Sequence, residues 1–260
     1  GVYNDGGTRP NNVLLWNHSF GSFAYVQPWD GGYNTTVDNS VYASPAVVDG
    51  VVYVGSLGNH MKAFYANNGT VIWDQEFDGD IHASPAVVDG VVYFTDYNKK
   101  LNALHTNDGS PHWTAADIGA AGHSSPAVVD NVVYVGSDNG KVYAFNTADG
   151  SAVGGWNGLT NTTPTATDRM HSSPAVAGNF VYIGNEDGKV YALYKNNGTE
   201  AWNYTTGGPV LTSPAVAGGV VYVGSNDGGI YALNANTGSY IWANDTFNGV
   251  QSSHAVADGV

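Results

Sequence analysis

The segment SPAVAGGVVYVGSNDGGIYALNANTGSYIW, residues 213–242, is one complete copy of the unit that decides the fold. Its opening motif, Ser-Pro-Ala-Val, begins at Ser44, Ser84, Ser125, Ser173 and Ser213, and the variant Ser-His-Ala-Val begins at Ser253. The intervals between successive copies are 40, 41, 48, 40 and 40 residues. A near-constant period of this length is typical of a repeat architecture in which each unit is one supersecondary structure.

Each unit contains short runs that are typical of β-strands. A short turn after Ala-Val leads to a run of β-branched and aromatic residues, such as Val51–Val54 or Val220–Val223. A polar turn then precedes a second apolar run, such as Lys141–Phe145 or Lys189–Leu193, and a further Gly-containing turn leads to a Trp. Asp-Gly and Asn-Gly turns between such runs predict successive antiparallel hairpins. No segment of useful length has a 3.6-residue apolar period, so we expect almost no helix.

Four strands in about forty residues predict an all-β chain folded as a β-propeller with four-stranded antiparallel blades. A solenoid is the alternative, but the rungs of a parallel β-helix are shorter and lack two tight hairpins. We expect a single domain over residues 1–260, with units starting near residues 44, 84, 125, 173, 213 and 253. Five blades are complete in the sequence. A sixth is split between the end of the chain and an N-terminal closing strand near residues 12–17, and seven or eight blades follow if the natural chain continues.

A Trp recurs at the end of each unit. These residues are Trp73, Trp113, Trp156, Trp202 and Trp242, with Trp16 in the N-terminal segment. A large ring at a fixed place is expected to fill the wedge between neighbouring blades, burying roughly 150–250 Å². In most units a Gly four residues earlier permits the turn and a close approach by a neighbour. These are Gly69, Gly109, Gly198 and Gly238, whereas the third unit has two extra residues between Gly150 and Trp156.

The frame Ala232-x-Asn234-x-x-Thr237-Gly238-x-x-x-Trp242 resembles the tryptophan-docking motif of the pyrroloquinoline-quinone (PQQ) family of propellers. The likeness covers about residues 44–260 and implies the fold. The family includes quinoprotein dehydrogenases and non-catalytic prokaryotic, notably archaeal, surface proteins. The dehydrogenases hold PQQ and calcium with Glu, Asn and Asp ligands, and they use a catalytic Asp, an Arg and an adjacent cysteine pair. Here there is no cysteine, and the only arginines are Arg9 and Arg169. We therefore predict no catalytic residue and no cofactor, with PQQ or calcium as the alternative.

The composition excludes several classes of function. The formal charge of −14 opposes binding to nucleic acid or to anionic membranes. The absence of cysteine rules out disulfides, Cys-ligated zinc and thiol catalysis. No apolar run is long enough to span a bilayer. The first residues lack a basic segment followed by an apolar one, so we expect that a signal peptide either was removed or never existed. We expect a secreted protein that is extracellular or at the cell surface.

The best-defined candidate site consists of histidines at one repeat position. His82, His123 and His171 each precede the repeated Ser by two residues in consecutive units. Equivalent positions in a ring put the three side chains at one level around the axis, where imidazoles can bind a transition metal. The alternative is that this position starts the inner strand, accepts any medium-sized polar side chain and lines a water-filled channel. In the remaining units the position is occupied by Tyr42, Leu211 and Gln251, and His254 replaces the motif Pro in the last unit.

Two further patterns suggest calcium binding and glycosylation. Asp74, Glu76, Asp78 and Asp80 alternate after Trp73, but they lack the bidentate Glu of a calcium loop, so a solvated acidic loop is favoured. Asn-x-Ser/Thr sequons are consistent with an extracellular, glycosylated protein. The sequons begin at Asn17, Asn34, Asn68, Asn161, Asn197, Asn203 and Asn244.

Three functions are compatible with these features. The first is a non-catalytic scaffold that binds proteins or glycans, because uniform units lack the special residues of an active site. Two long connections, residues 17–43 and 157–172, are the expected binding loops. The second is a structural subunit of a sheath, surface layer or filament that self-assembles through the incomplete terminal blade. The third is a quinoprotein dehydrogenase.

Overall fold

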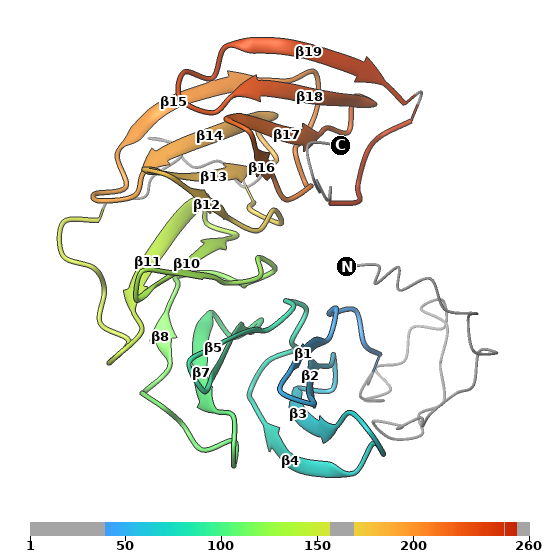
Figure 1. The fold of residues 1–260 in the computed structure, drawn as a ribbon, viewed down its shortest axis with the longest axis vertical. Coiled ribbons are helices and arrows are strands. Elements are labelled where there is room, and N and C mark those ends of the chain that lie inside the picture. Colours follow the sequence, from blue (N-terminus) through green and yellow to red (C-terminus); the bar gives the residue numbers. More distant parts are fainter. Residues whose placement is uncertain (1–39, 157–168, 247, 254–260) are drawn as a thin grey trace, which may run out of the picture.

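A computed structural model describes residues 40–156, 169–246 and 248–253. These residues form five antiparallel sheets, which follow one another around an arc (Figure 1). The predicted all-β propeller class is confirmed. No helix occurs among the described residues, and none of them forms a helical membrane span.

Each sheet is one blade, numbered here from the N-terminal end. Blade 1 consists of β1 (Ala46–Val48), β2 (Val51–Gly55), β3 (His60–Tyr65) and β4 (Val71–Glu76). Blade 2 consists of β5 (Ala86–Val88), β6 (Val91–Thr95), β7 (Lys100–His105) and β8 (Ala116–Asp117). Blade 3 consists of β9 (Ala127–Val129), β10 (Val132–Ser137) and β11 (Lys141–Asn146). Blade 4 consists of β12 (Ala175–Ala177), β13 (Phe180–Gly184), β14 (Lys189–Tyr194) and β15 (Glu200–Thr205). Blade 5 consists of β16 (Ala215–Ala217), β17 (Val220–Gly224), β18 (Gly229–Asn234) and β19 (Tyr240–Asp245).

Strands within a blade pair in sequence order. The short first strands, such as β1 and β16, lie nearer the centre of the arc, and the last strands, such as β4 and β19, lie at its periphery (Figure 1). The first hairpin of every blade has a two-residue turn, which is Asp-Gly in blades 1 and 2 and contains Asn or Gly in the others. Asp49 and Gly50 have φ values of 50° and 76°, as a type I′ turn requires. The Asp-Gly signal therefore predicted the turns of blades 1 and 2 correctly.

Blade 3 departs from the prediction of four strands. Its sheet has three strands among the described residues, and Ala152 makes only an isolated bridge to Phe145. The two extra residues before Trp156 are part of a turn at Gly154 and Gly155, where Gly155 has a φ of 79°. A turn inserted here interrupts the pairing that forms β4 or β15 in the other blades. The predicted sixth, split blade lies largely outside the described residues, as does Trp16.

The apolar core lies between blades. One cluster joins Tyr53, Met61 and Trp73 of blade 1 to Ile81 and Phe94 of the second unit. Three similar clusters join the later blades pairwise. Because blades 2, 3 and 4 each pack against a neighbour on both sides, the stability of the arc depends on contacts between consecutive units.

The repeated Trp is central to these contacts. The Trp202 side chain is buried, and its indole Nε1 donates a hydrogen bond of 3.0 Å to the carbonyl oxygen of Ala235 in the next blade. A Cβ atom built on Gly238 would lie 2.6 Å from the Trp202 ring. Trp73 and Trp113 make the same indole bond to the following blade. Trp156 instead donates to Val142 of its own blade, at 3.2 Å, so the insertion changes this contact.

The repeated Ser forms a second link between blades, which the sequence pattern did not predict. The Oγ atom of each motif Ser accepts a hydrogen bond from the backbone N–H of the equivalent Ser in the preceding unit. The donor and acceptor pairs are Ser44 and Ser84, Ser84 and Ser125, Ser125 and Ser173, and Ser173 and Ser213, all at 2.9 Å, and Ser213 and Ser253 at 3.1 Å. Each bond contributes about 1 kcal/mol. Together they form a continuous belt of hydrogen bonds across the five described blades.

Candidate functional site

Two positions of the repeat meet beside the central axis. One is the position two residues before the motif Ser, which His82, His123 and His171 occupy. The other is the first residue of the turn that follows the second strand. The backbone N–H of this turn residue donates a hydrogen bond to a carbonyl oxygen that lies two residues before the histidine position. The pairs are Leu57 to Ser40, Tyr97 to Asp80, Asp138 to Ala121, Glu186 to Arg169 and Asn226 to Pro209, at 2.8–3.2 Å.

This repeated backbone bond brings the side chains of the two positions together. The ring centroids of His82 and His123 are 5.1 Å apart, and those of His123 and His171 are 4.3 Å apart. Tyr97 packs between units, with its centroid 5.4 Å from His82 and 5.3 Å from His123. Tyr42 extends the row, 6.1 Å from His82. We call these five rings, contributed by consecutive units, the axial rim.

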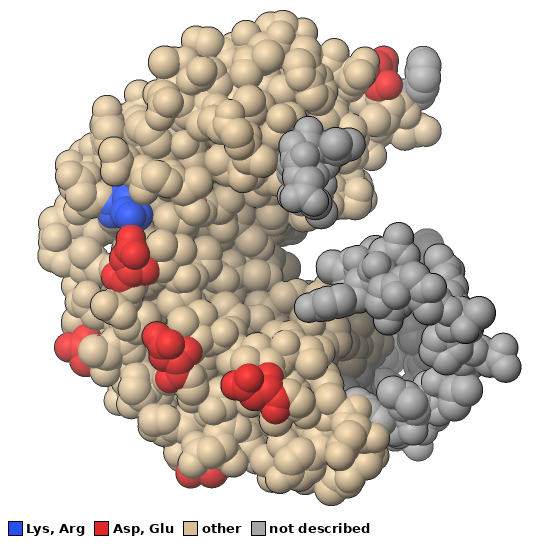
Figure 2. Space-filling view, in the orientation of Figure 1, with Lys and Arg blue, Asp and Glu red and all other residues tan. Residues whose placement is uncertain are grey.

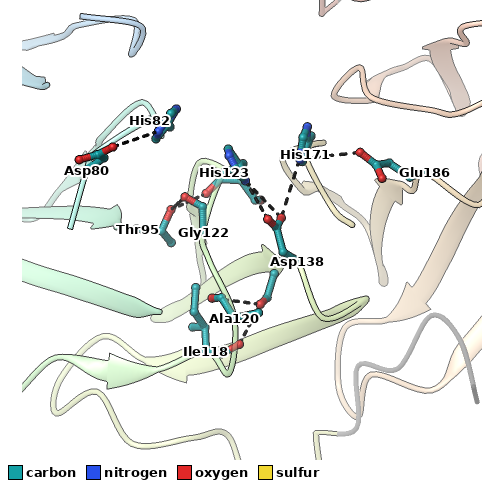
Figure 3. A network of polar contacts seen from close by, with 12 residues as sticks. Asp80, His82, Thr95, Ile118, Ala120, Gly122, His123, Asp138, His171 and Glu186 are labelled. Carbon is teal, nitrogen blue, oxygen red and sulfur yellow. Dashed lines mark hydrogen bonds and ion pairs between the residues drawn. The ribbon is translucent and has the colours of Figure 1, made fainter. Parts of the chain in front are cut away.

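Two carboxylates lie beside the histidine end of the axial rim (Figure 3). Asp138 Oδ2 is 3.0 Å from His123 Nδ1, and Asp138 Oδ1 is 4.0 Å from His171 Nε2. Glu186 Oε1 lies 3.8 Å from the same His171 nitrogen. His171 Nε2 is buried and has no hydrogen-bond partner. A histidine nitrogen thus faces two acidic groups without bonding to either.

Burial decides the charge of the outer two histidines. It lowers the pKa of His82 and of His171, and the electrostatic interaction with the neighbouring His123 lowers the pKa of both further. Asp80 and Asp138 act in the opposite direction on His82 but are outweighed, and Asp138 and Glu186 are likewise outweighed at His171. Both rings are therefore neutral at neutral pH, the form in which imidazole can bind a metal.

The structure places the three predicted histidines in a row, but His82 is outside the most compact group. Among the described residues, three potential metal ligands approach one another within 4.8 Å only at His123, Asp138 and His171. The role of His82, His123 and His171 as metal ligands stays a prediction. Sequence reasoning missed Asp138 and Glu186, because only the backbone bond from each turn to the segment before a histidine brings the two positions together.

The acidic run after Trp73 does not gather into a second site among the described residues. Asp74 pairs with Lys62 Nζ at 2.9 Å and with His60 Nδ1 at 2.7 Å. Asp80 Oδ2 instead lies 3.9 Å from His82 Nε2, toward the axis. The reading of this run as a solvated acidic segment rather than a calcium loop stays a prediction.

The sequons that the structure describes lie at the surface. Asn68, Asn203 and Asn244 are exposed, and Asn197 is partly exposed. The Oδ1 atoms of Asn68 and Asn197 accept bonds from the backbone N–H of Thr70 and Thr199, at 2.9 and 3.0 Å. Asp108 and Asp149 make the same bond in their units, so two sequons have a structural origin in the repeat turn. Asn17, Asn34 and Asn161 lie outside the described residues, as do residues 17–39 and 157–168 of the expected binding loops.

The fold and the repeat define a β-propeller built from PQQ-type units. The family model described as outer membrane protein assembly factor BamB matches residues 11–172 and 155–258, and the chain belongs to this family. No protein matches in a search of curated proteins.

Solved structures share the fold at low sequence identity. BamB from Moraxella catarrhalis is 17% identical with a TM-score of 0.71, and the match covers 84% of this chain and 67% of that one. The computationally designed Ika8 protein is 17% identical with a TM-score of 0.72, over 83% of this chain and 65% of that one. The quinohemoprotein alcohol dehydrogenase ADHIIG from Pseudomonas putida HK5 is 19% identical with a TM-score of 0.63, over 80% and 42%. The chain thus spans about two thirds of the first two structures and less than half of the third.

Proposed function

We propose that this propeller is a non-catalytic scaffold of the cell envelope that binds a protein partner through its axial rim. The observation that carries the proposal is the exposure of the tyrosines at one end of the rim. Tyr42 is 70% exposed and Tyr97 is 47% exposed, next to the partly buried His82. Aromatic residues are enriched at protein interfaces because they bury a large area at a small entropic cost.

The family supports a partner that is a protein and a location in the envelope, since its description names an outer membrane assembly factor. The charges beside the axial rim support a partner of opposite charge. Carboxylate oxygens of Asp80, Asp138 and Glu186 lie 3.0–4.0 Å from its histidine nitrogens. Elsewhere, one face of the arc carries few charged side chains, most of them acidic (Figure 2). An aromatic patch in acidic surroundings favours a partner segment that combines apolar and basic residues.

The axial residues also support a non-catalytic role. The resemblance to quinoprotein dehydrogenases implies Glu, Asn and Asp ligands, an Arg and a cysteine pair around PQQ. The described blades instead bring two tyrosines and three imidazoles to the axial rim, with three carboxylates beside them, and the sequence contains no cysteine. This donor set does not fit the cofactor.

Removing the two exposed rim tyrosines should weaken partner binding. We expect the double variant Tyr42→Ala/Tyr97→Ala to reduce affinity at least about tenfold, because truncated aromatic anchors are the residues that cost most at interfaces. The matched control is Tyr65→Ala/Tyr194→Ala, which removes two tyrosines that are 48% and 43% exposed but lie at the ends of β3 and β14. The measurement is surface plasmon resonance with the partner captured from an envelope extract of the producing cells.

Equal affinity of the rim variant and the wild-type chain would contradict the proposal, as would a larger loss in the control. A glycan array run in parallel tests the other class of ligand. Retention of a defined glycan by the wild-type chain and its loss in the rim variant would replace the protein partner with a glycan at the same surface.

A structural subunit is the second candidate, and the exposure of β19 favours it. All six residues of β19 are exposed, and Trp242 is 41% exposed where Trp202 is 8% exposed. An apolar strand with this exposure is a site for pairing with another chain. Light scattering that gives one monomer mass at all concentrations would exclude self-assembly through this strand.

A further inference from the structure

We infer that His123, Asp138 and His171 form a binding site for a divalent transition-metal ion such as zinc. The inference does not depend on the proposed partner. It concerns the compact group of two imidazoles and one carboxylate, rather than the row of three histidines.

The distances within this group are close to those that a metal requires. A tetrahedral ion with bonds of about 2.0–2.1 Å separates its ligand atoms by about 3.3 Å. His123 Nδ1 and Asp138 Oδ2 are already 3.0 Å apart, and Asp138 Oδ1 and His171 Nε2 are 4.0 Å apart. All three ligand atoms lie within 4.8 Å of one another. A side-chain rotation of His171 toward Asp138 completes the group.

The polar atoms of the group lack a partner that a cation would supply. His171 Nε2 is buried without a hydrogen bond and lies 4.0 Å from Asp138 and 3.8 Å from Glu186. If this nitrogen carries a lone pair, the lone pair faces two negative charges. If it carries a proton, no acceptor lies within bonding distance. A divalent cation bound to Nε2 and Asp138 removes both costs.

The electrostatics and the donor types identify the class of ion. Asp138 and Glu186 together supply two negative charges, which balance a divalent ion. Glu186 lies just outside the group and adds charge rather than a required ligand. Imidazole donors favour zinc, copper, nickel or iron, whereas magnesium and calcium favour oxygen ligands alone. The site is therefore expected to discriminate against magnesium and calcium.

The local fold holds two of the three ligands, Asp138 and His123, with little freedom. Asp138 is held by the bond from its own N–H to the Ala121 carbonyl, at 3.1 Å, two residues before His123. His123 and Asp138 have side chains that are only 18% and 10% exposed. The serine belt also links the segment after His123 to the segment after His171, through the bond of 2.9 Å between Ser125 and Ser173. A preorganised carboxylate and imidazole leave only His171 to adjust when the ion binds.

Isothermal titration calorimetry on the full, untagged chain tests the inference, with zinc chloride as the probe and magnesium chloride as the comparison. We expect one zinc site per chain and no heat from magnesium. His171→Gln and Asp138→Asn should each reduce zinc affinity by more than about 100-fold, since even outer partners of metal ligands cost 10–100-fold. His105→Gln is the matched control, because His105 meets His112 edge to face, with ring centroids 4.9 Å apart, but lies outside the group. It should leave zinc affinity unchanged.

Variants that fail to fold would mimic a loss of zinc, so far-ultraviolet circular dichroism and melting in EDTA accompany each titration. Asp138→Asn keeps an acceptor for His123 and should melt like the wild-type chain in EDTA. His82→Gln should change zinc affinity less than twofold. No zinc heat from the folded wild-type chain would overturn the inference. A loss in His82→Gln as large as in His171→Gln would also overturn it, in favour of the three-histidine row.

Discussion

Replacing Trp202 by Ala is expected to lower the free energy of unfolding by about 3–5 kcal/mol. The ring is 8% exposed and packs between blades 4 and 5, so its loss leaves a cavity at the interface. The Ala235 carbonyl loses one of two donors, because Trp202 Nε1 and the Tyr182 hydroxyl both bond to it at 3.0 Å. Urea unfolding followed by circular dichroism measures the change.

Two companion variants separate burial from hydrogen bonding. Trp202→Phe keeps an aromatic ring but loses the indole N–H, and it should cost about 1–2 kcal/mol. Trp242→Ala removes the same repeat residue where it is 41% exposed, and it should cost about 1 kcal/mol because less buried area is lost. If Trp202→Ala and Trp242→Ala proved equally destabilising, the contact between blades 4 and 5 would not be the source of the effect.

Gly109→Ala is expected to destabilise the protein by about 2–5 kcal/mol, the second largest effect. The new Cβ atom would lie 2.8 Å from Trp73 Cδ2, so the ring of blade 1 and the turn of blade 2 would have to separate. Gly109 also has a φ of 71°, which an alanine adopts only with strain. Thermal melting and urea unfolding report the combined cost.

The control for Gly109 is Gly50→Ala, which introduces the same strain without the clash. Gly50 has a φ of 76°, and a Cβ atom added there would have no neighbouring atom within 4 Å. We expect this variant to cost about 1–2 kcal/mol from the backbone alone. The difference between the two variants measures the close approach of the blades, and a difference of zero would show that backbone strain explains everything.

The sequence predicted the strand pattern well because the turn chemistry and the side-chain pattern agree. Asp49-Gly50 marks a two-residue hairpin, and β-branched runs such as β2 and β6 flank such turns. The exception is the outer part of blade 3, where the sequence displays an insertion. The two extra residues before Trp156 are evident from the repeat spacing, but the spacing alone does not predict that a turn at Gly155 replaces the strand.

The sequence predicted the histidines of the candidate site but not its carboxylates. The histidines share one repeat position, so a common level at the axis followed from the period. Asp138 and Glu186 belong to a different position that has the residue types of an ordinary turn, and only the backbone bond to the loop before each histidine brings them together. The serine belt was missed for a similar reason, because a motif Ser gives no indication that its Oγ accepts a bond from the preceding unit.

Site-specific photo-cross-linking tests most directly whether the axial rim is the binding surface. A p-benzoyl-phenylalanine placed at Tyr97 reports contacts at the rim, and the same group at Tyr194 reports contacts at the end of β14, at closely similar exposures of 47% and 43%. Mass spectrometry of cross-links formed in producing cells should identify one partner protein at position 97 and none at position 194. The same partner cross-linked only from position 194 would contradict a function at the axis.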